Sequence, residues 1–156
     1  MMRISSDYAG RTVDLEILQT AAVPSSSLTL AMTPAGGGVS RKVTGMQKLA
    51  QRYANLFLTY LGSVRFRQGQ GTEFVQAVAG GYVQNRNSLL GYFIISDSAV
   101  RNQLAADVAD GDPDDEVLQS SELLDYDLDP GTARLLLRVS LVSRAGEDYT
   151  FIIPTA

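Results

Sequence analysis

The fold is decided by residues 45–74, whose sequence is GMQKLAQRYANLFLTYLGSVRFRQGQGTEF. Its first half places apolar residues at helical spacing, so that they would share one stripe of an amphipathic helix. These residues are Met46, Leu49, Tyr53, Leu56, Phe57 and Tyr60. Thr44 stands where a side chain can cap the start of a helix, and Gly62 where a left-handed residue can end one. We therefore expect a core helix between these two residues, with the other elements packed around it.

The second half of this stretch predicts a basic strand and a turn. Val64-Arg65-Phe66-Arg67 alternates apolar and basic residues, which is typical of a short extended segment. Residues 68–71 predict a turn into a second helix, with Thr72 as its cap, Glu73 in its first turn and Gly80-Gly81 at its end. The basic strand has two interpretations: a surface for an acidic partner, or an edge strand protected by its charges.

Downstream of residue 81 the pattern predicts a long helix. Asn87 or Ser88 would cap it, and it would reach about as far as Val108, with a candidate break at residues 96–98. The expected stripe is Leu90, Ile94, Arg101 and Leu104, flanked by Leu89, Phe93, Val100 and Val108.

The C-terminal third predicts a β-meander. Strands are expected at residues 123–128, 133–143 and 148–153, joined by turns at 129–132 and 144–147 that contain Pro, Gly and Asp. The middle strand is the longest and most apolar of the three, so we expect it at the centre of the sheet. The fold class is therefore α+β, with helices packed on a small antiparallel meander.

The N-terminal residues predict a separate β arm. Val13, Leu15 and Ile17 alternate with polar residues, a second short strand is expected at 28–32, and residues 34–38 (PAGGG) form a linker. We divide the chain into the arm with its linker, residues 1–39, and an α+β domain, residues 40–156. A two-stranded arm is marginal alone, so it would pair either with its own core or with a neighbouring subunit.

Composition excludes several kinds of function. The 156 residues include no cysteine and no histidine, which removes thiolate sites, the commonest general base and the commonest metal ligand. The formal net charge of −4 argues against nucleic-acid binding, because such proteins need a positive surface to neutralise phosphates. No secretory signal and no apolar run of membrane-spanning length is visible, so we expect no membrane partner.

Three motifs are candidate chemical sites. The acidic loop, which contains Asp110, Asp112, Asp114, Asp115 and Glu116, has the wrong spacing for a calcium loop, so a solvated loop is favoured. Gly69 and Gly71 are not followed by the lysine that a phosphate-binding loop requires. Glu73 would need a second carboxylate about 5–9.5 Å away to act as a glycosidase. We therefore expect no enzyme, no cofactor and no bound metal.

With these residues in view, the chain resembles the baseplate wedge, or sheath-initiator, family of contractile-tailed bacteriophages, which also includes a baseplate component of type VI secretion systems. The resemblance covers approximately residues 40–154. The matching residues are Lys48-Leu49, Gln51-Arg52, Leu61-Gly62-Ser63, Phe66, Gly69, Gly71, Thr72 and Phe74. Family members commonly carry a Glu-Pro-Arg triplet after the long helix, where this chain has Asp112-Pro113-Asp114-Asp115-Glu116.

The resemblance implies a structural virion component, assembled in the host cytoplasm and present in several copies around the tail tube. Its expected partners are other wedge proteins and the sheath protein, with the tail tube or hub as further candidates. Strand exchange would connect the chain to its neighbours. The expected partner-binding residues are Val13, Leu15, Ile17, Arg65, Phe66, Arg67, Tyr149, Phe151 and Ile153.

On this interpretation, trimming the chain after Asp148 should leave a folded protein that no longer initiates sheath. Two alternatives are a small tail-lysozyme-like glycan hydrolase, with Glu73 and an acidic-loop residue as its pair, and a tail adaptor of a non-contractile phage.

Overall fold

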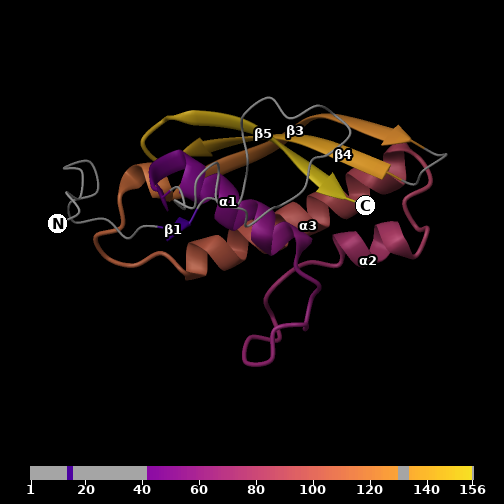
Figure 1. The fold of residues 1–156 in the computed structure, drawn as a ribbon, viewed down its shortest axis with the longest axis horizontal. Helices are drawn as coiled ribbons and strands as arrows, with labels where there is room; N and C mark the ends of the chain where they lie inside the picture. Colours follow the sequence, from indigo (N-terminus) through magenta and orange to yellow (C-terminus); the bar gives the residue numbers. More distant parts are fainter. Residues whose placement is uncertain (1–13, 16–41, 130–133, 156) are drawn as a thin grey trace, which may run out of the picture.

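Helices cover one face of a three-stranded antiparallel sheet, which is the predicted α+β class (Figure 1). The structure, a computed structural model, describes residues 14–15, 42–129 and 134–155. Helix α1 spans Gly45–Leu58, α2 spans Phe74–Ala79 and α3 spans Arg86–Ala106. A short 3-10 helix, η2 (Asp114–Glu116), precedes the sheet strands β3 (Leu118–Asp129), β4 (Arg134–Ser143) and β5 (Asp148–Thr155).

Helix α1 forms the predicted core. Its apolar stripe is buried from Met46 to Phe57, and Tyr53 and Phe57 are fully enclosed. The predicted end is wrong: the helix stops at Leu58, and Thr59 adopts an extended conformation that turns the chain outward. Gly62 has the expected positive φ of 79°, but it lies in the following loop. Tyr60 is therefore outside the helix and 43% exposed.

The start of α1 is held by a residue distant in sequence. Thr44 occupies the N-cap position without a side-chain cap hydrogen bond. Instead, the Gly45 N–H donates to Oε1 of Glu116 at 3.1 Å, and the Lys48 ammonium donates to Oε2 of the same carboxylate at 2.6 Å. Both charged side chains are buried. The acidic loop is thus not wholly solvated, because its last carboxylate supplies the negative charge that a helix N-terminus favours.

Helix α3 is continuous, without the candidate break at residues 96–98. Its N-cap is Asn85, which forms a capping box with Ser88, so the helix begins a few residues before the predicted caps. The predicted stripe was also displaced, because Ile94 and Arg101 are exposed. The residues that α3 buries are Leu89, Phe93, Ser96, Asp97, Val100 and Leu104.

A buried polar cluster connects three elements at the middle of the core. The Tyr53 hydroxyl of α1 and the Ser121 hydroxyl of β3 both donate to Oδ1 of Asp97 on α3, each at 2.5 Å. The partly exposed Arg101 lies 3.9 Å from the other oxygen of Asp97. These contacts satisfy a carboxylate that would otherwise be costly to bury, and they fix α1, α3 and β3 relative to one another.

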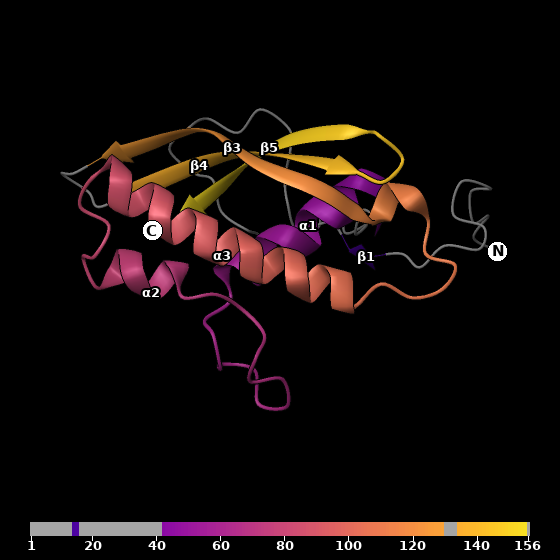
Figure 2. The same ribbon diagram turned by 180° about the vertical axis from the view of Figure 1, so that it is seen from behind.

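The sheet has the order β3-β4-β5, with β4 at its centre as predicted. Leu135, Leu137, Val139 and Leu141 of β4 are fully buried and face the helices. The register places Asp127 opposite Leu136 and Asp125 opposite Arg138, so these side chains share the outer face of the sheet, away from the helices. Figures 1 and 2 show the helices on one side of the sheet only.

Strand β5 is an integral part of the core. Ile153 is fully buried and Phe151 is 6% exposed, and β5 contacts α1 as well as β4. The expectation that the chain folds without the residues after Asp148 is therefore wrong, because that deletion would remove two core side chains and expose the inner strand.

The described part of the N-terminal arm is short. Strand β1 (Asp14–Leu15) pairs antiparallel with β2 (Lys42–Val43), the segment directly before α1. Val13, Ile17 and the expected strand at 28–32 lie outside the described residues. Among the described residues, no helix combines the length and the apolar composition that a membrane-spanning segment needs.

Candidate functional site

The most distinctive surface feature is the loop of residues 60–72, which connects α1 to α2. In both ribbon views this loop extends from the helical layer in the direction opposite to the sheet (Figures 1 and 2). Its two ends meet in a parallel bridge between Tyr60 and Thr72. The Leu61 N–H donates to the Thr72 carbonyl at 3.0 Å, and the Thr72 N–H donates to the Thr59 carbonyl at 2.8 Å. We call these paired ends the neck of the loop. A loop closed in this way belongs to the compact Ω type.

Thr72 and Gly71 fasten the neck to the core. The buried Thr72 hydroxyl donates to the Phe57 carbonyl at 2.7 Å and accepts from the Phe74 N–H at 3.3 Å, so it connects the end of α1 to the start of α2. Gly71 has a φ of +100°, and a Cβ there would lie 2.5 Å from the Thr59 carbonyl oxygen. Only glycine fits this close approach.

The Gln103 side chain of α3 binds the neck of the loop. The Gln103 Oε1 accepts from the Gly71 N–H, and the Gln103 Nε2 donates to the Gly71 carbonyl, both at 2.9 Å. This two-point contact satisfies both backbone polar groups of one loop residue. Sequence reasoning missed Gln103, because a glutamine on an amphipathic helix carries no signal of a partner 32 positions away.

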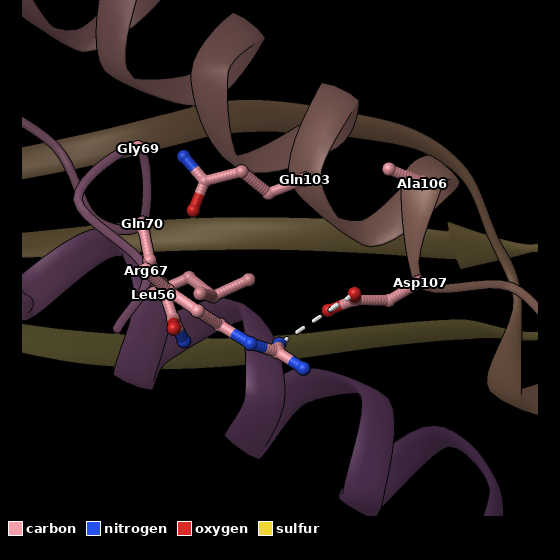
Figure 3. A pocket seen from close by; sticks show the side chains of 7 residues that line it. All are labelled: Leu56, Arg67, Gly69, Gln70, Gln103, Ala106 and Asp107. Carbon is pink, nitrogen blue, oxygen red and sulfur yellow. Dashed lines mark ion pairs between the residues drawn. The ribbon is translucent and has the colours of Figure 1, made fainter. Parts of the chain in front are cut away.

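A hollow lies between the loop and α3, as Figure 3 shows. It has a volume of about 250 Å³, and its lining residues are Leu56, Arg67, Gly69, Gln70, Gln103, Ala106 and Asp107. Asp107 lies 3.8 Å from Arg67 of the loop and 3.9 Å from Arg52 of α1. These long, exposed contacts are weak, so the loop is positioned by its neck rather than by its charges.

The tip of the loop presents basic and aromatic side chains to solvent. Phe66 is 90% exposed, and the Arg65 guanidinium lies 5.6 Å from the centre of its ring. The predicted basic strand is wrong, because successive reverse turns carry residues 60–70: Ser63, Arg67 and Gln70 each donate to the carbonyl three positions earlier. Arg65, Phe66 and Arg67 therefore lie on a loop and not on a strand, and their role as a contact surface stays a prediction.

The other predicted partner-binding residues are not part of this surface. Phe151 and Ile153 point into the core, and Tyr149 is half-buried and stacks on Phe151 with ring centroids 6.2 Å apart. Leu15 lies in β1, away from the loop (Figure 1). The outer backbone edge of β5 stays accessible, because β5 pairs with β4 alone among the described strands.

The candidate chemical groups do not converge. Glu73 is exposed at the N-cap position of α2, and Glu116 is buried against Lys48 and the start of α1. Among the described residues, no group of three or more acidic side chains is placed to hold a metal ion. Burial, and then the charge of Asp97 beside it, raise the pKa of the Tyr53 hydroxyl. That group is enclosed in the core, where it serves packing.

Comparison of the chain with protein-family models, with curated proteins and with solved structures gave no match. The resemblance to the sheath-initiator family, stated above on the residues that carry it, therefore stays a prediction.

Proposed function

We propose that this protein is a structural component of a phage tail baseplate that connects wedge proteins to the first ring of sheath by strand exchange. It would be present in several copies around the tube and would perform no catalysis. The observation that carries the proposal is the outer edge of β5, whose backbone has no partner among the described strands while its inward side chains are buried. A strand in this state can accept a further strand without any change in the core.

The residues behind the family resemblance give a second line of support. Gly71, Thr72 and Phe74 are the residues that build the neck of the 60–72 loop, and Phe66 stands at its tip. A matching motif whose members fix and present one exposed loop is more consistent with an assembly surface than with a pocket for small molecules.

The backbone edge of β5 offers a clean test. Pro154 lies within β5 opposite Leu136, and proline is tolerated in a strand where its nitrogen faces away from the neighbouring strand. Because successive residues alternate in direction, the N–H groups of Thr150 and Ile152 also face the outer edge. Thr150 is exposed, so replacing it leaves the core intact.

We expect Thr150→Pro to remain folded and to lose sheath initiation, because it removes one donor that an added strand needs. Thr150→Ala, which keeps the donor, should behave as the wild type. Complementation of a phage that lacks this gene, followed by electron microscopy of its tails, compares the two variants. Normal sheathed tails from a folded Thr150→Pro protein would contradict strand exchange at β5.

A further inference from the structure

The tip of the 60–72 loop has the properties of a docking group that lacks its partner. Phe66 is 90% exposed, the largest exposure among the large apolar side chains of the described residues. Arg65 and Arg67 flank it, and the loop sequence YLGSVRFRQGQGT contains no acidic residue. Aromatic and arginine side chains presented together are the commonest anchors of protein interfaces, and their charge calls for an acidic partner with an apolar centre.

A surface of that kind exists on the same chain. A hollow of about 490 Å³ opens on the outer face of the sheet, and its lining residues are Asp125, Tyr126, Asp127, Leu136, Arg138 and Ile152. We call this the acidic hollow. Leu136 and Ile152 are half-buried and give it apolar character, while Asp125 and Asp127 are exposed at its rim.

The charge at the acidic hollow is negative overall. Glu122 lies on the same face of β3, opposite Ser140, and adds a third carboxylate to the row. Arg138 is the one basic residue that lines the hollow, and it stands opposite Asp125 in the register. Three acids and one base leave this surface able to attract the two arginines of the loop tip.

The loop and the acidic hollow lie on opposite sides of one molecule. The loop extends from the helical layer away from the sheet, whereas the hollow is on the sheet face that no described helix covers (Figures 1 and 2). The loop tip therefore cannot occupy the hollow of its own chain, but it is well placed to occupy that of another copy.

We propose that the loop tip of one copy docks into the acidic hollow of a second copy, with Phe66 against Leu136 and Ile152 and with Arg65 and Arg67 facing Asp125 and Asp127. The contact is head-to-tail, so in a pair the first copy keeps its hollow free and the second keeps its loop free for further copies. Such contacts build a ring where the rotation between copies closes, and a filament where it does not. The inference concerns this chain alone and does not depend on the proposed role in a baseplate.

The one described contact that competes for the tip is weak. Arg67 lies 3.8 Å from Asp107 of its own chain, and its side chain is 65% exposed. Exposed pairs of this kind contribute little, so Arg67 can exchange Asp107 for the carboxylates of a second copy.

Sedimentation velocity of the purified full-length protein over a range of concentrations provides the test. The wild type should form species larger than a monomer at low ionic strength, and these should dissociate as salt is added. Phe66→Ser should weaken association at least about tenfold, as expected for a central aromatic anchor. Tyr82→Ser is the matched control, since Tyr82 is an aromatic residue that is 65% exposed outside the loop, and it should change nothing.

Charge reversal identifies the partner surface. The double variant Arg65→Glu, Arg67→Glu and the double variant Asp125→Lys, Asp127→Lys should each stay monomeric alone, because each brings like charges together. An equimolar mixture should assemble again, because each loop then meets a hollow of opposite charge. Thermal melts of each variant establish that it is folded.

A wild type that stays monomeric at all concentrations and salt conditions would overturn the proposal. The loop would then be a contact surface for a different protein. Assembly that persists in both folded charge variants, or a mixture that fails to assemble, would overturn it equally. None of these outcomes bears on sheath initiation, which the Thr150→Pro comparison tests separately.

Discussion

Tyr53 is the residue at which α1, α3 and β3 are joined, through the carboxylate of Asp97. Removing its hydroxyl leaves Asp97 with one donor fewer in a buried site, which typically costs about 1–3 kcal/mol. Because burial and the neighbouring Asp97 raise the pKa of Tyr53, the folded protein retains this proton at a pH where the unfolded chain, with a tyrosine pKa of about 10, loses it.

This pKa difference predicts a loss of stability in alkaline solution. Below about pH 10 both states hold the proton, so Tyr53 adds no pH dependence. Above it, the unfolded state alone releases the proton, and the free energy of unfolding should fall by about 1.4 kcal/mol per pH unit on this account. Urea unfolding of the wild type and of Tyr53→Phe between pH 8 and 11 measures it. The variant should be less stable at pH 8 and should show the shallower slope; equal slopes would contradict the assignment.

Glu116 is the second residue on which the core depends, because it joins the start of α1 to the segment before β3. Glu116→Gln breaks a buried ion pair with Lys48 and removes the charge at the helix N-terminus. Disrupting such a pair typically costs about 3–5 kcal/mol, whereas an exposed pair contributes about 0–1 kcal/mol. Asp114→Asn is the matched control, since Asp114 pairs with Arg144 at 3.6 Å on the surface. Similar urea midpoints for the two variants would show that the buried pair is not important.

Both of these polar contacts escaped prediction from the sequence, for the same physical reason. Tyr53 and Asp97 are 44 positions apart, and Lys48 and Glu116 are 68 apart. Helical periodicity identifies the apolar stripe of α1 but contains no information on which distant carboxylate will meet it. The one available signal was Asp97 itself, which falls on the stripe between Phe93 and Val100, where a polar residue is out of place.

The 60–72 loop is the element whose geometry matters most, and its neck makes a specific prediction. Gly71→Ala places a Cβ 2.5 Å from the Thr59 carbonyl oxygen at a φ of +100°. Backbone strain of this kind costs about 1–3 kcal/mol, and the clash would displace the neck. Gly69→Ala, in the same loop, meets no heavy atom within 4 Å and should be near neutral.

Hydrogen exchange measures this effect at the neck itself. The Thr72 N–H, which donates to the Thr59 carbonyl at 2.8 Å, should exchange faster in Gly71→Ala and unchanged in Gly69→Ala. Equal protection of Thr72 in the two variants would contradict the role given to Gly71.

At the scale of elements, prediction succeeded where patterns were long and failed where they were short. The apolar stripe of α1, the length of α3 and the meander with β4 at its centre all follow from periodicity and turn chemistry. The basic strand rested on only four alternating residues, and the hydrogen bonds of three turns outweighed that alternation. Likewise, β5 alternates as an exchangeable edge strand would, and only its burial shows that its side chains belong to the core.

At the scale of the whole molecule, the fold has two distinct sides (Figures 1 and 2). One is a sheet whose outer face no described helix covers and whose two outer strands pair, among the described strands, with β4 alone. The other is a helical layer from which the 60–72 loop protrudes. Among the described residues, neither side gathers three or more acidic side chains placed to hold a metal ion. The fold class could be predicted from sequence, whereas the position of the loop relative to the sheet could not, because it depends on how α1 and α3 pack. The proposed function rests on the motif residues and on these surfaces.

The most direct test of the proposed function is a cryo-EM reconstruction of contractile tails assembled in the presence of this protein. We expect density for residues 42–155 between the wedge proteins and the first sheath ring, repeated around the tube, with a strand of a neighbouring subunit along the outer edge of β5. Complete, sheathed tails that lack this chain would contradict the proposal.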